Sequence, residues 1–142
     1  MSAEPPPDQE GRPVLVVDAA NVIGSVPDGW WRDRAAAVRR LRDSLGSVAV
    51  NSLPGLPGPM DVVLVVEGAA RRVEPVPGVC VVAAPRSGDG DDAIVQVVAD
   101  RRDEPVYVVT ADRKLRDRVG ALGATVLGPK TLLGALDARD RS

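Results

Sequence analysis

The sequence predicts a single three-layer α/β/α domain around a central, mostly parallel sheet of five strands. Its length of 142 residues fits one domain with its own core. Continuous apolar runs, such as VLVV at 14–17, are typical of strands buried on both faces of a parallel sheet. These runs alternate with longer segments of helical periodicity, and this alternation favours the α/β class.

Short apolar runs supply the predicted strands, each bounded by turn-forming or charged residues. The strands are expected at 14–17, 61–68, 79–84, 105–110 and 124–128. A turn is expected after the first strand, at Gly24, Pro27 and Gly29. Cys80, the only cysteine, lies inside the third run, so we expect a small buried apolar side chain.

Four segments supply the predicted helices, at 30–46, 91–101, 111–123 and 131–138. In the first, apolar residues recur at helical spacing, and Gly46 is expected to end the helix. Its buried face is expected to hold Trp31, Ala35, Val38, Leu41 and Leu45. Trp30 is then the tryptophan that is exposed and able to stack on a nucleobase.

The domain is expected to cover residues 13–138. Residues 1–12 are acidic and proline-rich, so they are predicted to be a disordered tail, and 139–142 form a short C-terminal tail. The start of the chain has no apolar stretch typical of a signal peptide. No apolar run approaches the ~20 residues of a membrane helix, so a cytoplasmic protein without membrane contact is predicted.

The composition excludes several kinds of active site. The chain has no histidine, which rules out Ser-His-Asp triads, histidine acid–base chemistry and histidine-ligated zinc. A single cysteine leaves neither a disulfide framework nor a zinc finger. Any chemistry must therefore use Asp, Glu, Lys, Arg, Ser, Thr or a bound metal.

Acidic and polar side chains follow four of the predicted strands, at the point where each strand ends. In chain order they are Asp18 and Asn21, Glu67, Asp91 and Asp92, and Thr110 and Asp112. Carboxyl ends of parallel strands share one edge of the sheet, where ligands bind. Crowded carboxylates repel one another unless a cation lies among them. Mg²⁺ or Mn²⁺ is therefore predicted at this edge, with Asp18 at its centre.

Most of these residues also have a structural interpretation. Asp91 and Asp112 each begin a predicted helix, where Asp is a favoured cap. Asn21 can shape a turn, and Glu67 can be a solvated strand end. Asp18 is the exception, because no predicted local element requires a charge after VLVV. The functional interpretation therefore depends on the acids converging in space.

Basic side chains follow the same strand ends, although the net charge of the chain is only −2. They include Arg71, Arg86, Arg113 and Lys114. Cations around an acidic centre suit a polyanionic substrate whose reacting phosphate lies at the metal. A solvated helix face accounts equally well for the basic run that begins at Arg113.

Four motifs resemble the NYN branch of the PIN-like nuclease superfamily, and most closely its YacP-like members. The motifs are VVDAANVI, VVEG, GDGDDAI and VVTADRKLR, in the order of the family and within 14–127. The resemblance implies a PIN-like, Rossmann-like fold. It assigns the metal-binding acids to Asp18, Asp91 and Asp112, and adds Asp92 and Glu67 as further candidates.

The motifs also depart from the family at two places. Glu67 stands where the family usually has Asp, and its longer side chain changes the reach of the carboxylate. Ala19 and Ala20 stand where YacP-like proteins typically have Gly-Tyr, which removes a substrate contact. The three principal acids are intact.

The resemblance implies a Mg²⁺- or Mn²⁺-dependent endoribonuclease. It would hydrolyse single-stranded or structured RNA with metal-activated water and leave 5′-phosphate and 3′-hydroxyl ends. Asn21 and Thr110 would orient the acids or contact phosphate. Arg113, Lys114, Arg86 and Arg71 would bind the RNA backbone. PIN-like proteins often dimerise, so a homodimer is left open.

Three other functions stay open from the sequence. A metal-dependent nucleotide phosphohydrolase would use the same acids, although the chain has no GxxxxGK[ST] phosphate loop. A receiver-like signalling module would match Asp18, Thr110 and Lys130 but gives no reason for the other acids. A non-catalytic RNA-binding protein would keep the fold without the chemistry.

Overall fold

The chain folds around a five-stranded parallel sheet, in a computed structural model that describes residues 12–26, 29–56, 58–85 and 90–140. The strands are β1 (Val14–Asp18), β2 (Asp61–Val66), β3 (Val79–Ala83), β4 (Val106–Val109) and β5 (Thr125–Leu127). Their order is β3-β2-β1-β4-β5, and every adjacent pair is parallel. The predicted α/β class with a five-stranded central sheet is confirmed.

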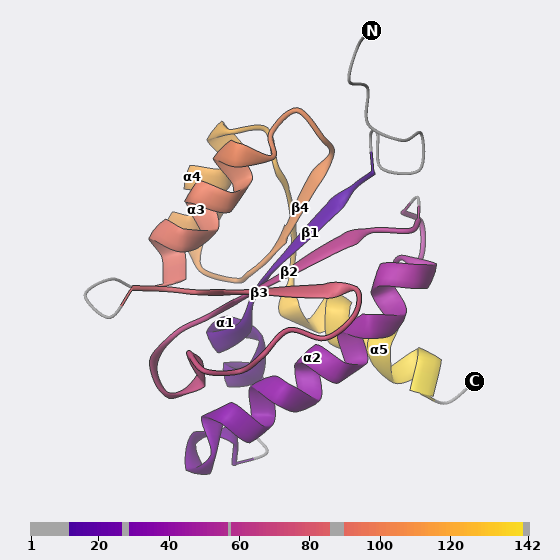
Figure 1. Cartoon of the computed structure of the whole chain (residues 1–142). Coiled ribbons are helices and arrows are strands. Elements are labelled where there is room, and N and C mark those ends of the chain that lie inside the picture. The colour runs from indigo at the N-terminus through magenta and orange to yellow at the C-terminus, as the bar shows by residue number, and fades with distance from the viewer. Residues whose placement is uncertain (1–11, 27–28, 57, 86–89, 141–142) are drawn as a thin grey trace, which may run out of the picture.

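Helices cover both faces of the sheet and complete three layers (Figure 1). In chain order they are α1 (Ala19–Gly24), α2 (Arg34–Asn51), α3 (Gly90–Asp100), α4 (Arg113–Ala121) and α5 (Pro129–Asp140). One face carries α1, α2 and α5, and the other carries α3 and α4. Two short 3₁₀ turns are η1 (Trp30–Arg32) and η2 (Gly68–Ala70).

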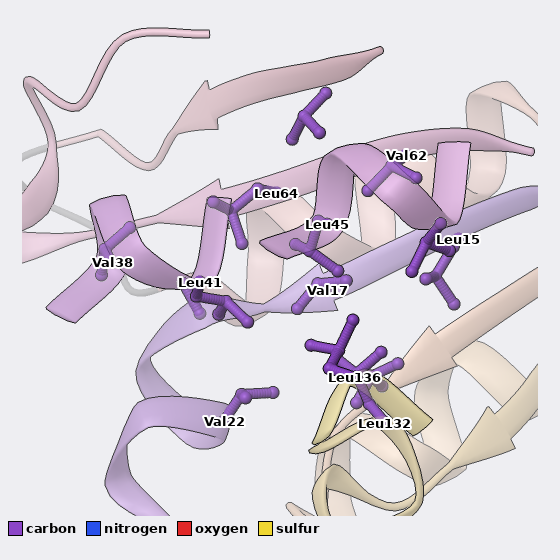
Figure 2. Close-up of a cluster of buried hydrophobic side chains, with 14 of the residues drawn as sticks. Leu15, Val17, Val22, Val38, Leu41, Leu45, Val62, Leu64, Leu132 and Leu136 are labelled. Atoms are coloured by element: carbon purple, nitrogen blue, oxygen red, sulfur yellow. The ribbon is translucent and has the colours of Figure 1, made fainter. Parts of the chain in front are cut away.

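β1 is buried along its whole length because helices cover it from both sides. Leu15 and Val17 belong to the core beneath α1, α2 and α5, whereas Val14 and Val16 belong to the core beneath α3 and α4. Figure 2 shows the first core, where side chains of β1 and β2 meet those of α2 and α5. Each buried Val or Leu stabilises the fold by roughly 1.5–3 kcal/mol, so a central strand favours a continuous apolar run.

Two helices differ from the sequence prediction. The sequence predicts no helix between Asp18 and the turn expected at Gly24, but the short helix α1 lies there, and Ala19 and Ala20 favour it. α2 continues past Gly46, because Val48 and Ala49 extend its buried face. Burial of these side chains outweighs the ~1 kcal/mol cost of one glycine inside a helix.

Two side chains expected in the core are exposed. Trp31 is 58% exposed, because it lies in η1 and not on the buried face of α2. The side chain of Trp30 lies outside the described part of the structure. Cys80 is exposed because β3 is an edge strand.

Only the inner ends of the two predicted tails lie within the described residues. Residues 1–11 and 141–142 lie outside the described residues, and Arg12 pairs with Asp61 at the start of β2. α5 runs to Asp140 and so enters the segment predicted as a C-terminal tail. No described helix is both long and apolar enough to cross a membrane. The cytoplasmic location stays a prediction.

Candidate active site at the carboxyl edge of the sheet

The strand order changes direction between β1 and β4. From β1 the chain passes to β2 and β3 on one side, and then crosses to β4 and β5 on the other. In open parallel sheets, ligands bind outside the carboxyl ends of the strands at such a point. Asp18 is the last residue of β1, and Thr110 directly follows β4. Both residues therefore stand where this architecture places a site.

Asp18 is only 7% exposed and is held by two hydrogen-bond donors. The Thr110 hydroxyl, itself fully buried, donates to Oδ2 at 3.0 Å, and the backbone N–H of Asn21 donates to Oδ1 at 3.3 Å. The second bond makes Asp18 the N-cap of α1. Helix α1 therefore uses a polar residue directly after VLVV as its cap. The expectation that no local element accounts for Asp18 is corrected in this respect. Ser, Thr or Asn would cap equally well without burying a charge.

Further hydrogen bonds join α1 to the loop between β4 and α4. The Ala111 N–H donates to Oδ1 of Asn21 at 2.9 Å, and the Asp112 N–H donates to Oγ1 of Thr110 at 3.2 Å. Asp112 accepts from the Leu115 N–H at 3.1 Å and caps α4, as its structural interpretation predicts. Asn21 is thus part of a helix and connects two strand ends, rather than only shaping a turn.

Burial raises the pKa of the Asp18 carboxyl from its ordinary value of 3.8 to about 6. The hydrogen bonds from Thr110 and Asn21 act in the opposite direction. The negative charges of Asp91 and Glu67 raise the pKa further, so both lie within electrostatic range of Asp18. Three of the predicted acids therefore interact unfavourably at this edge, and a bound cation would reverse that cost.

Glu67 connects the end of β2 to the start of α3. Its Oε2 accepts a hydrogen bond from the N–H of Gly90, where the helix dipole favours a negative charge. A Cβ at Gly90 would lie 2.6 Å from this oxygen, so a side chain at position 90 would displace the Glu67 carboxylate. Asp91 follows directly in the first turn of α3. Asp92 is exposed and pairs with Arg118 of α4 at 3.0 Å.

Three of the four predicted basic residues lie in the described part of the chain. Arg113 and Lys114 are exposed at the start of α4, and Arg71 is partly exposed just after η2. Arg86 lies outside the described residues. The three described cations therefore flank the carboxyl edge on the segments that follow β2 and β4.

A cavity of about 230 Å³ lies beside the strand ends. It is lined by Ala19, Ala20, Ile23, Arg34, Val38, Glu67 and Ala70. Arg34 is a lining residue that the sequence motifs do not indicate. Its place at the start of a helix could have indicated a site residue, because helices that follow parallel strands begin near the carboxyl edge. Arg34 is the first residue of α2.

The fold has close counterparts among solved structures, although no protein-family model and no curated protein matches the chain. The structure of Rae1 (YacP) from Bacillus subtilis aligns with a TM-score of 0.70 at 19% identity, covering 90% of this chain and 75% of that one. A point mutant of the same protein aligns with a TM-score of 0.72 at 18% identity, covering 90% and 76%.

The chain has the fold of YacP. The resemblance of its motifs to YacP-like proteins is thereby confirmed at the level of the fold. The alignment covers 90% of the chain, so it includes most of the sheet and helices that carry the candidate site.

The resemblance to YacP-like proteins implies a Mg²⁺ or Mn²⁺ site. The side-chain oxygens at the carboxyl edge can be compared with what these ions prefer. Asp18, Asp91 and Glu67 supply the hard oxygen donors that these ions prefer. Within the described residues, no three acidic or cysteine side chains form a group that could hold a metal ion by themselves. Mg²⁺ commonly binds only one or two carboxylates and completes its shell with water and substrate phosphates. The donor set fits a site of that open kind.

Proposed function

We propose that this chain is a metal-dependent endoribonuclease that uses Asp18, Asp91 and Asp112. The observation that carries the proposal is the state of Asp18. It is buried at the change in strand order, its pKa is raised to about 6, and the charges of two further acids act on it. Burying a carboxylate beside two like charges costs stability, and a cation bound among them would offset that cost.

Asp18 and Asp91 are the carboxylates we propose to bind Mg²⁺ or Mn²⁺ first. Asp112 uses Oδ1 to cap α4, so Oδ2 is its remaining donor. Glu67 acts on Asp18 electrostatically and is a further candidate, and Asp92 is another, whose Oδ1 pairs with Arg118. When bound, the metal supplies an activated water and neutralises charge on the phosphate.

The residues around the acids orient the site and hold the substrate. Thr110 and Asn21 fix both oxygens of Asp18, so the carboxylate keeps one orientation toward the edge. Arg113, Lys114 and Arg71 are proposed to contact RNA phosphates, with Arg86 as a further contact. Such contacts give RNA binding that weakens as salt concentration rises.

The proposal is tested by incubating the purified chain with single-stranded and structured RNA in Mn²⁺, in Mg²⁺ and in EDTA. We expect cleavage with a metal, none in EDTA, and products that carry 5′-phosphates. The double variant Asp18→Asn, Asp112→Asn should be inactive. Full activity of this variant would contradict the assignment. Hydrolysis of nucleoside triphosphates with no cleavage of RNA would instead favour the nucleotide phosphohydrolase.

A further inference from the structure

We propose that the cavity beside Asp18 is a nucleotide subsite, in which Arg34 holds a phosphate and the apolar wall contacts the attached base. This inference rests on the proposed function, because it takes the ligand to be an RNA nucleotide next to the bond that is cut. The cavity lies between the starts of α1 and α2 and the end of β2.

The lining of the cavity has two chemically distinct parts. Ile23, Val38 and Ala70 are buried apolar residues, and they give a wall that suits the face of a nucleobase. Arg34 supplies a cation, whose planar guanidinium can bind phosphate oxygens in pairs. A nucleotide also combines an anionic group with a flat, weakly polar ring. The volume of about 230 Å³ is below the range of drug-sized ligand sites, roughly 300–1,000 Å³, and suits a single unit.

The cavity borders the acidic edge through Ala19 and Glu67. Ala19, which lines it, directly follows Asp18 in the chain. Glu67 also lines it, and the charge of Glu67 contributes to the raised pKa of Asp18. A nucleotide in the cavity would therefore lie beside the carboxylates that are proposed to act on the neighbouring phosphate.

Arg34 is placed to direct its charge into this region. It is the first residue of α2, after the N-cap Asp33, and helix N-termini favour anions. Its guanidinium Nη1 lies 3.7 Å from the position that a Cβ on Gly68 would occupy. Arg34 thus reaches from α2 across to the turn that follows β2 and Glu67. The phosphate is assigned to the Arg34 guanidinium, because the Glu67 carboxylate would repel it.

The small residues after Asp18 leave room for the ligand. Ala19 and Ala20 present only methyl groups to the cavity, and Ala20 is partly exposed. A leucine at position 20 would fill part of this space. Alanine and leucine are both strong helix formers, so Ala20→Leu should leave α1 folded.

The test measures binding without cleavage, using a 3′-fluorescein-labelled, single-stranded RNA of eight nucleotides in EDTA. Fluorescence anisotropy gives the dissociation constant. We expect Arg34→Gln to weaken binding about fivefold and Ala20→Leu about tenfold. Arg39→Gln is the matched control, because Arg39 is an exposed arginine of α2 outside the cavity lining, and it should bind as the wild type does.

The outcomes separate this inference from the proposed function. Wild-type affinity in either Arg34→Gln or Ala20→Leu overturns the subsite, even if the wild-type chain cleaves RNA. The same holds if the octamer does not bind to the wild type. Weakened binding in both variants, with normal binding by Arg39→Gln, supports the subsite even if no cleavage is found. Circular dichroism and a thermal melt of each variant ensure that a loss of binding is not a loss of fold.

Discussion

The two ends of the central strands carry acids in opposite electrostatic situations. At the amino end, Asp61 begins β2 and pairs with Arg12 at 3.4 Å and with Arg101 at 2.6 Å. At the carboxyl end of the neighbouring strand, the hydrogen bonds that Asp18 accepts within the described residues come from neutral donors, and its charge is opposed by those of Asp91 and Glu67. The charge of Asp61 is thus balanced by arginines at the amino end. At the carboxyl end, the charges that act on Asp18 within the described residues are of the same sign.

The amino end is a complete ion-pair network. Arg101 also pairs with Glu104 at 3.0 Å, and the hydrogen bond to Glu104, followed by that to Asp61, raises the pKa of the Arg101 guanidinium. Two arginines and two acids therefore balance each other. Of the two ends, the carboxyl end is therefore the better candidate for a cation site, because the charge of Asp18 is opposed there rather than paired.

The largest expected difference between the two ends is in activity. Asp18→Asn removes the central proposed metal ligand and should lower RNA cleavage at least ~100-fold. Asp61→Asn breaks the ion pairs at the amino end and should leave the cleavage rate unchanged. Both are measured with the same RNA and Mn²⁺ concentration. Equal losses in the two variants would mean that the ends do not differ in function.

The second difference is in the pH dependence of stability without metal. The pKa of Asp18 rises from 3.8 in its ordinary state to about 6 in the fold, so the folded state holds this proton more tightly. Stability contributed by the protonated form is present below about pH 4 and is lost as the pH rises to about 6. The loss is roughly 3 kcal/mol.

Urea unfolding in EDTA, at pH values from 4 to 8, measures this effect. Other groups titrate in the wild type and in Asp18→Asn alike. The informative quantity is therefore the difference between their unfolding free energies at each pH. We expect Asp18→Asn to gain stability over the wild type as the pH rises through this window. Parallel profiles would show that the Asp18 charge is not costly in the fold.

The third difference concerns the amino end alone. Arg101→Gln removes the arginine that joins Asp61 and Glu104. These side chains are about a third exposed, so solvent screens the pairs and the expected loss is about 1 kcal/mol of unfolding free energy. Urea unfolding at pH 7 measures the loss, and RNA cleavage should be unchanged. A fall in cleavage with unchanged stability would reverse the roles assigned to the two ends.

The smallest effect is expected at the rim of the carboxyl end. Asp92 and Arg118 form an ion pair whose side chains are 73% and 45% exposed. Arg118→Gln should therefore change the unfolding free energy by less than about 0.5 kcal/mol. The melting temperatures of Arg118→Gln and the wild type are compared. A clear fall in the variant would show that the Asp92–Arg118 pair stabilises the fold as the ion pairs at the amino end do.

The sequence was sufficient for the sheet because its signals are local. The run VLVV predicts a strand covered on both faces, and β1 is the central strand. The acids at the strand ends could be placed on one edge because parallel topology requires it. Asp112 as a cap of α4 was also predicted from its place before a helical segment.

What the sequence did not predict depends on contacts between distant segments. Gly46 lies inside α2 because packing outweighs its preference, and Cys80 is exposed because β3 is at the edge of the sheet. The contact between Glu67 and Gly90 joins residues from separate motifs. The cavity beside Arg34 requires three elements to meet, and a single residue pattern does not encode that meeting.

Isothermal titration calorimetry at pH 7.5 directly tests whether Mn²⁺ binds at the carboxyl end of the sheet and requires Asp18. The wild type and the two variants Asp18→Asn and Asp61→Asn are titrated under identical conditions. We expect the wild type and Asp61→Asn to bind Mn²⁺ with the same affinity, and Asp18→Asn to lose binding. Binding that is unchanged in Asp18→Asn, or lost in Asp61→Asn, would contradict the claim that Asp18 and the acids near it at the carboxyl end form the site.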